Sequence, residues 1–157
     1  MASPVEYISH SVEQTRALGA RLGRILTGGE VIALIGPLGA GKTQWVKGLS
    51  NGAGVTDPDV VNSPTFVLVN EYAGRVYIHH LDAYRLAGPA ELGALGFDEM
   101  IDSGSTVIVE WADRVISILP EDRLTVTLEI AGPTERRIRG VANGPTSSRL
   151  LCVWENR

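Results

Sequence analysis

The sequence predicts an α/β domain with a mixed sheet, in which parallel strands form the core, antiparallel strands are added beside them and helices cover both faces. Short apolar runs at residues 31–35 and 106–109 are typical of parallel strands that are buried on both faces. Alternation of apolar and polar residues at 66–81 and 124–130 is typical of antiparallel strands. With 157 residues, the chain is long enough for one domain, and we expect that domain to span residues 1–157.

The central motif lies at residues 36–43, which read GPLGAGKT and fit the pattern G-x-x-x-x-G-K-[ST]. In such a loop the backbone N–H groups wrap the phosphates of a nucleoside triphosphate, and the following helix directs the positive end of its dipole at them. The apolar run before the motif and the helix-compatible residues 44–49 after it have the order that this mechanism needs. The motif therefore indicates a phosphate-loop (P-loop) NTPase domain.

Two side chains of this loop have distinct expected roles. Lys42 supplies a cation for the β- and γ-phosphates, and Thr43 supplies a hydroxyl for Mg²⁺. We expect the side chain of Lys42 to face the ligand rather than the core. The predicted nucleotide contacts of the loop are Gly36, Leu38, Gly39, Ala40, Gly41, Lys42 and Thr43.

Composition and charge exclude several classes of protein. The net charge of −4 disfavours an autonomous nucleic-acid binder, and the basic run at 136–139 fits a solvated strand as well as an RNA contact. A membrane span needs about 18 consecutive apolar residues, and no run in the sequence is that long. The N-terminus lacks the pattern of a signal peptide, so we expect a cytoplasmic protein with no membrane contact. Cys152 is the only cysteine, which excludes an internal disulfide and a cysteine-based zinc site.

The first helix is predicted from Ser11, which fits a capping box with Gln14, and its apolar spacing continues to Leu26 before Thr27 and two glycines end it. A helix just before the strand of a phosphate loop can reach the nucleotide base. Thr15 is therefore a possible base contact, although a polar residue in a first turn is usually only solvated.

Two candidates follow the loop helix. Pro64 disfavours helix for the residue before it, so Thr65 is presented from an extended or turn segment that leads into the strand at 66–70. Thr65 can sense the γ-phosphate and Mg²⁺ as switch residues do, or it can simply cap the strand. Residues 66–81 predict an antiparallel hairpin that ends in Asp82. In phosphate-loop enzymes, a carboxylate at this position holds Mg²⁺ or orients the attacking water.

The adjacent histidines of this hairpin, His79 and His80, point to opposite faces of their strand. That arrangement is poor for a shared metal site, so we expect structural or surface roles for both.

A second helix is predicted from Pro89, with core contacts at Leu92, Leu95, Met100 and Ile101. Glu110 directly follows the strand at 106–109. Because burial of a carboxylate is costly without a cation or donors, we expect Glu110 to face the crevice for Mg²⁺ and phosphate, a surface position being the alternative.

The remaining segments complete the fold. We expect a short helix at 112–119, a half-exposed antiparallel strand at 124–130 and a partner strand around 137–141. The segment 150–154 is left without an assignment.

Five segments together resemble the TsaE (older name YjeE) family, the bacterial ATPase of the tRNA threonylcarbamoyladenosine pathway. They are GPLGAGKT, SPTF-x-L-x-x-x-Y at 63–72, H-x-D-x-YRL at 80–86, the helix with Glu91-Leu92 and Leu95-Gly96, and VEWADR at 109–114. The family usually has Gly-Asp-Leu-Gly at the start of the loop. Pro37 stands at the second position here and removes one N–H from the cradle.

The resemblance implies the cofactors ATP and Mg²⁺ and assigns roles to six residues. Lys42 binds phosphate, Thr43 and Glu110 serve Mg²⁺, and Asp82 is the catalytic or Mg²⁺-linked carboxylate. Thr65 resembles the switch threonine of the family, and Trp111 resembles the tryptophan beside the nucleotide. Thr65, Asp82 and Glu110 make up the expected catalytic set.

The implied activity is weak ATP hydrolysis that is coupled to the TsaB and TsaD proteins. That pair installs threonylcarbamoyl on adenosine 37 of tRNAs, and ATP hydrolysis is thought to reset the complex between turnovers. The chain would reach tRNA only through the complex, and we expect a monomer on its own.

Other classes of function use the same loop. A small-molecule kinase would need an acceptor pocket and usually an arginine-rich lid, and the sequence has no long insertion that could form one. A regulatory GTPase would read guanine through Asn-Lys-x-Asp, which is absent. A nucleotide-dependent binding module without turnover stays open.

Overall fold

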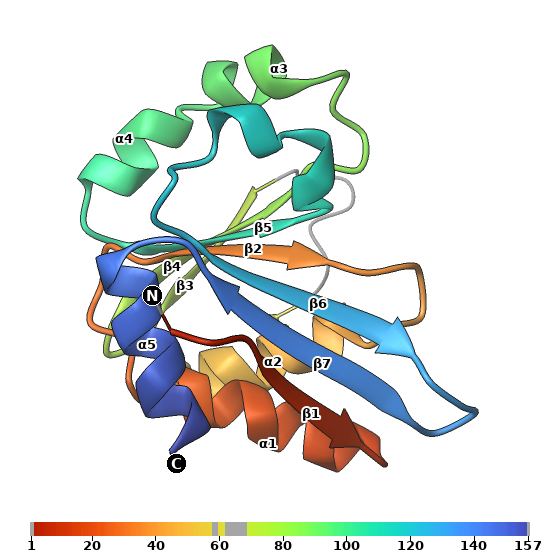
Figure 1. Cartoon of the computed structure of the whole chain (residues 1–157). Coiled ribbons are helices and arrows are strands. Elements are labelled where there is room, and N and C mark those ends of the chain that lie inside the picture. The colour runs from red at the N-terminus through yellow and green to blue at the C-terminus, as the bar shows by residue number, and fades with distance from the viewer. Residues whose placement is uncertain (1, 58–59, 62–68, 157) are drawn as a thin grey trace.

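The computed structural model describes residues 2–57, 60–61 and 69–156. Thr65 and the predicted start of a strand at 66–68 lie outside the described residues. The described part of the chain forms a seven-stranded sheet in the order β1-β7-β6-β2-β5-β4-β3 (Figure 1). The strands are β1 Val5–Ser9, β2 Val31–Ile35, β3 Val69–Ala73, β4 Tyr77–Asp82, β5 Thr106–Glu110, β6 Leu124–Ile130 and β7 Arg136–Ala142.

The sheet has the predicted mixed topology. Strands β6, β2, β5 and β4 are parallel neighbours, whereas β7 and β1 at one side and β3 at the other pair antiparallel. In β2, Ile32 and Leu34 pack into the apolar core on one face while Ala33 packs into the core on the other. This double burial is the reason that a continuous apolar run forms the centre of the sheet.

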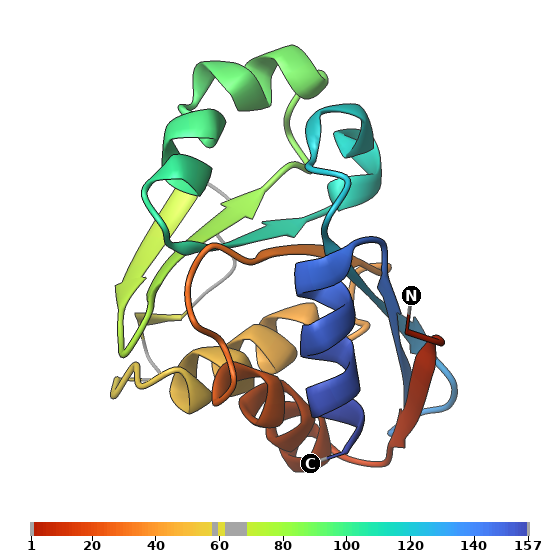
Figure 2. The ribbon, with the colours of Figure 1, turned by 60° about the vertical axis from the view of Figure 1, so that its left-hand side comes forward.

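Helices cover both faces (Figure 2). One face carries α1 Val12–Gly23, α2 Lys42–Gly52 and α5 Pro145–Glu155. The other carries α3 Pro89–Ala94, α4 Phe97–Asp102 and two short 3₁₀ turns, Ala112–Arg114 and Ile116–Ile118. Within the described ranges, no helix has the length and apolar content that a membrane crossing requires. The predicted fold class is confirmed.

Several predicted elements differ in detail. The second helix is divided into α3 and α4 at Gly96, whose φ is 85°, and the helix predicted at 112–119 consists of the two 3₁₀ turns. The strand at 124–130 is antiparallel to β7 as predicted, but its other edge is parallel to β2. Strand β1 and helix α5 had no predicted assignment. Both need tertiary partners, because β1 pairs with β7 and α5 packs on the core.

Helix α1 begins and ends close to its predicted signals. The hydroxyl of Ser11 accepts a hydrogen bond from the N–H of Gln14 at 3.1 Å, and the Gln14 side chain accepts one from the N–H of His10 at 2.7 Å. The reciprocal bond of the predicted capping box is therefore made to the residue before Ser11. The helix ends at Gly23, earlier than the apolar spacing predicts.

Glycines allow the backbones of α1 and α2 to touch. A Cβ atom at Gly48 of α2 would lie 1.9 Å from the carbonyl oxygen of Arg16, and one at Gly19 of α1 would lie 2.2 Å from that of Trp45. Gly23 and Gly52 make equally close approaches farther along the pair. Because α2 begins at the phosphate loop, this contact fixes where the loop lies relative to α1.

We predict that Gly48→Ala lowers the free energy of unfolding by roughly 3 kcal/mol or more. Overpacking costs about 1–3 kcal/mol, and here the clash is with backbone that cannot rotate away. Urea denaturation measures the change. Gly93→Ala in α3 is the matched control, because a Cβ there would meet nothing within 4 Å, and it should raise stability by up to about 1 kcal/mol. Equal stability of the two variants would contradict the packing argument.

A carboxylate from another element caps the N-terminus of α5. Asp122 accepts hydrogen bonds from the N–H groups of Thr146 at 3.0 Å and Ser147 at 2.9 Å. A side chain at the helix's own cap position, Gly144, would collide with it, since a Cβ there would lie 2.5 Å from Asp122 Cγ. Partial burial alone would raise the pKa of Asp122, but the hydrogen bonds from Ser147 and Thr146 outweigh it and hold that pKa below its ordinary value.

We predict that Asp122→Ala destabilises the protein by about 1 kcal/mol at neutral pH, the usual contribution of a helix cap. Because the folded pKa of Asp122 is depressed, this contribution is complete above the unfolded pKa and is lost as pH falls through the folded pKa. Urea titrations at a series of pH values should show the gap between wild type and variant narrowing in acid. The exposed neighbour Glu121→Ala serves as control, and a gap that stays constant or widens in acid would contradict the assignment.

Candidate functional site

The predicted phosphate loop connects the end of β2 to the start of α2. Gly39 and Gly41 have φ values of 82° and 98°, conformations that other residues rarely adopt, so the chain can turn tightly from strand to helix. The N–H of Trp45 donates to the carbonyl of Gly41 at 2.9 Å, which places the first turn of α2 directly after the loop. Pro37, the departure from the family pattern, accepts a hydrogen bond from the N–H of Ala40 at 3.1 Å.

The loop lines a pocket of about 370 Å³. Of the predicted contacts, Leu38, Gly39, Gly41, Lys42 and Thr43 line it, together with Pro37, Gln44, Glu110 and Trp111. Gly36 and Ala40 are not among the lining residues. Ala40 is fully buried in the core instead, and its N–H donates to the Pro37 carbonyl.

Lys42 is more buried than the sequence predicts, with a relative exposure of 7%. Its Nζ donates to the carbonyl of Gly36 and lies 3.7 Å from the centre of the Trp111 ring. Lys42 still lines the pocket, as expected of a side chain that faces the ligand, and the carbonyl and the π face replace part of the water that its ammonium loses. Burial lowers the pKa of Lys42, and three carboxylates act in the opposite direction, those of Glu110, Asp82 and Asp113.

Asp82 and Glu110 end adjacent parallel strands and are paired in the sheet register. Both are buried, with exposures of 5% and 2%. Glu110 lines the pocket, as predicted, and its Oε2 lies 2.6 Å from Nε2 of His80. Asp82 lies beside it rather than in the pocket lining, and its Oδ1 accepts the N–H of Tyr84 at 2.8 Å. The structure thus brings both carboxylates to the end of the sheet where Lys42 lies.

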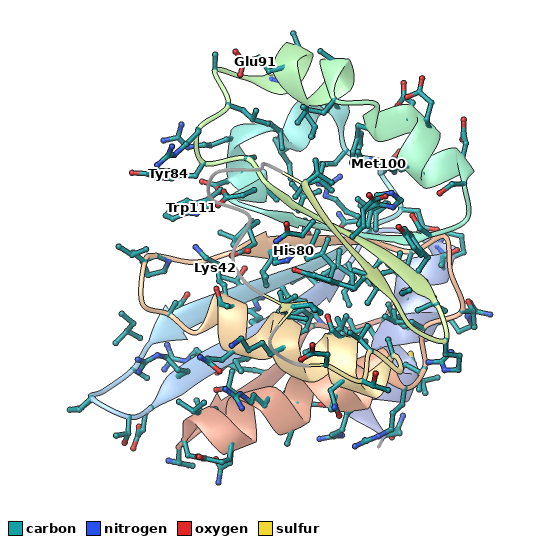
Figure 3. The ribbon with its side chains drawn as sticks, turned by 180° about the vertical axis from the view of Figure 1, so that it is seen from behind. Lys42, His80, Tyr84, Glu91, Met100 and Trp111 are labelled. Carbon is teal, nitrogen blue, oxygen red and sulfur yellow. The ribbon has the colours of Figure 1, made fainter. Side chains whose placement is uncertain are left out.

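Trp111 has an unusual backbone conformation. In the described part of the chain, Trp111 is the one residue other than glycine with a positive φ, at 57°. A backbone held in this rarely populated region is strained, and such strain is typical of functional sites. Its ring packs on Lys42 and on Tyr84, with 4.9 Å between the two ring centres. Arg114 lies over the other ring of this pair, 5.1 Å from the centre of Tyr84. Figure 3 shows Trp111 and Tyr84 at one end of the sheet near Lys42.

A second pocket of about 340 Å³ lies on the other side of the loop. Thr15, the possible base contact, lines this pocket, but the residue is only 3% exposed and its hydroxyl is 2.7 Å from that of Ser9. Gly39 and Gly41 line both pockets. Arg136, which also lines this pocket, donates to the carbonyl of Gly39 at 3.2 Å. The basic run at 136–139 is visible in the sequence, but only the pairing of β6 with β7 brings Arg136 to the loop.

The adjacent histidines point to opposite faces, as predicted. His79 Nδ1 is 2.7 Å from the hydroxyl of Ser105, and its Nε2 is 3.1 Å from Glu71. His80 instead contacts Glu110 at the pocket, a role that sequence reasoning missed. The available signal was the spacing H-x-D, which puts His80 on the same face of its strand as Asp82.

The side chains of this site fit a triphosphate with Mg²⁺. Lys42 and the N-terminus of α2 provide positive charge and N–H donors for phosphate oxygens. The Thr43 hydroxyl and the Glu110 carboxylate line the same pocket, and hard oxygen ligands of this kind suit Mg²⁺, which takes one or two carboxylates plus substrate phosphates. The arrangement can therefore bind a nucleotide and stabilise charge on its phosphates.

Comparisons with known proteins point to one family. The family profile described as "Threonylcarbamoyl adenosine biosynthesis protein TsaE" matches residues 9–138. A TsaE from Treponema pallidum is 38% identical over 131 residues, which are 83% of this chain and 96% of that protein. A TsaE from Bacillus subtilis is 38% identical over 141 residues, 89% of this chain and 86% of that protein.

A solved structure has the same architecture. The crystal structure of Bacillus subtilis YdiB matches with a TM-score of 0.86 at 30% identity, covering 99% of this chain and 97% of that chain. Profile, relatives and fold agree, and they show that the chain belongs to the TsaE family of tRNA threonylcarbamoyladenosine biosynthesis proteins.

Proposed function

We propose that residues 1–157 act as one phosphate-loop domain that binds Mg-ATP and hydrolyses it slowly within the machinery that makes N6-threonylcarbamoyladenosine at position 37 of tRNA. The observation that carries the proposal is the pocket in which Lys42 and Thr43 of the loop lie with Glu110 from the end of β5. A cation, a hydroxyl and a carboxylate in one pocket are the groups that phosphoryl transfer to water requires.

Each residue has a proposed task. Lys42 exchanges its contact with the Gly36 carbonyl for phosphate oxygens, and its positive charge then compensates the phosphates. Thr43 and Glu110 hold Mg²⁺, which supplies neutralisation of the charge that develops on the phosphates. Asp82, buried beside Glu110, holds Mg²⁺ or orients the attacking water. Thr65 lies outside the described residues, and its switch role rests on the family resemblance.

We place the nucleoside in the second pocket, beside the phosphate loop. It shares Gly39 and Gly41 with the first pocket, so one nucleotide can span both. Thr15, held by Ser9, would contact the base or ribose from α1. Arg136 would contribute a guanidinium from the β6–β7 hairpin at the same place.

Slow turnover follows from the charges around the phosphate site. Among the described residues that line the pocket with Glu110, Lys42 is the one with a positive charge. A transition state that lacks an arginine contact is poorly stabilised, and a partner that supplies one or orders a switch raises turnover by roughly 10³-fold or more. We infer that the TsaB and TsaD proteins act as this partner in the cytoplasm, and that tRNA is reached through them.

Phosphate release with and without TsaB–TsaD tests the proposal. We predict slow Mg²⁺-dependent release by the protein alone and a large increase with the partner pair. Glu110→Gln and Asp82→Asn should each lower kcat far more than ATP affinity, because a carboxylate that serves Mg²⁺ acts on the transition state. Their loss of turnover would show that the activity belongs to this site and not to a contaminant.

Two results would overturn the coupling. Full turnover in isolation, unaffected by the partners, would favour a stand-alone ATPase or a kinase. Nucleotide binding without phosphate release under any condition would favour a binding module.

Lys42→Met tests the phosphate contact with little loss of buried volume. Removal of a charged hydrogen bond of about 1.5–3 kcal/mol should weaken ATP binding by roughly 10–100-fold in titration calorimetry. Lys47→Met is the matched control, since it removes the same charge from the same helix without touching the pocket. Wild-type ATP affinity in Lys42→Met, or equal losses in both variants, would contradict the assignment.

A further inference from the structure

A row of buried polar side chains crosses three neighbouring strands and ends at Glu110. Tyr72 on β3, His80 on β4 and Glu110 on β5 have exposures of 2%, 0% and 2%. The Tyr72 hydroxyl is 2.9 Å from His80 Nδ1, and His80 Nε2 is 2.6 Å from Glu110 Oε2. The row therefore connects the interior of the sheet with the candidate nucleotide pocket.

The sheet register places these side chains on one face. His80 pairs with Ile108 of β5, two residues before Glu110, and with Asn70 of β3, two residues before Tyr72. Residues two apart in a strand share a face, so all three point to the side of α1 and α2. Figure 3 shows His80 farther inside the molecule than Lys42 and Trp111.

The direction of the hydrogen bonds follows from the chemistry of the groups. An ionised carboxylate only accepts, so Nε2 of His80 donates to Glu110. The other ring nitrogen of a neutral imidazole is an acceptor, and the Tyr72 hydroxyl is a donor placed to meet it. The side-chain amide of Asn70 donates in turn to the Tyr72 oxygen at 3.4 Å. Tyr72 thus favours the tautomer that His80 needs to hold Glu110.

Glu110 depends on this donor. Among the described residues, His80 is the hydrogen-bond donor to its carboxylate, whereas the nearby Lys42 ammonium bonds the Gly36 carbonyl. A buried carboxylate without its donor would lose both its orientation and a large part of its solvation.

We propose that His80 is a positioning residue that orients the Glu110 carboxylate for a divalent cation, and that Tyr72 sets the tautomer of His80. The inference rests on the proposed function, since it takes Glu110 as a ligand of the nucleotide-bound cation. Groups that orient a metal ligand commonly contribute roughly 10–100-fold to metal affinity.

The test measures Mn²⁺ binding to the ADP complex by electron paramagnetic resonance, so that its readout does not require turnover. His80→Leu should weaken Mn²⁺ binding by roughly 10–100-fold while ADP affinity without metal stays as in wild type. His80→Gln, whose amide N–H can still donate to Glu110, should restore most of the loss. Tyr72→Phe should cause a smaller loss in the same direction.

His79→Leu is the matched control. It removes a largely buried histidine from the same strand, but on the opposite face, so a general effect of destabilisation would appear in it as well. Mn²⁺ binding should stay at the wild-type level in this variant.

Three results would overturn the inference. They are wild-type Mn²⁺ affinity in His80→Leu, an equal loss in His79→Leu, and uptake of no Mn²⁺ by the wild-type ADP complex. If Mn²⁺ binding depends on His80 as expected but the wild-type protein releases no phosphate, the proposed hydrolysis would be refuted and the positioning role of His80 would stay in place.

Discussion

Direct backbone contact between α1 and α2 determines the geometry of the candidate site. The small residues Gly19 and Gly48 let the two helices approach until carbonyl groups of each touch the other. This approach presses Thr15 of α1 toward the loop, where its methyl group would lie 3.7 Å from a Cβ at Gly41. The phosphate loop thus lies at the end of β2 and against Thr15 of α1. Side chains of ordinary size between the two helices would displace the loop.

Charge burial at the carboxyl ends of β4 and β5 is the second constraint. Two carboxylates and an ammonium lie there with little exposure, so each must find partners that replace water. His80 serves Glu110, a backbone N–H serves Asp82, and Lys42 takes a carbonyl and an aromatic ring. The strained backbone of Trp111 persists because this packing holds the ring over the ammonium. The groups that make the site costly to fold are also the ones to which we assign the binding of phosphates and a cation.

Most of the fold could be predicted from the order of the elements along the sequence. Strand, loop and first helix follow one another directly, and the motif there needs no distant partner to be recognised. Prediction failed where stability comes from other elements, as for β1, which exists by pairing with β7, and for α5, whose cap is supplied by Asp122. It also failed at 112–119, where the positive φ of Trp111 begins a pair of 3₁₀ turns instead of one helix.

By itself, the sequence determined the parts of the site that depend on near neighbours. The phosphate loop, the acid at the end of each of two strands and the opposite faces of His79 and His80 all follow from spacing along the chain. Only the tertiary structure decided which of these groups meet. The contact of His80 with Glu110, the place of Arg136 at the loop and the burial of Lys42 depend on strand order, register and helix packing. Those are set by the balance of many weak contacts across the whole domain, which no local pattern contains.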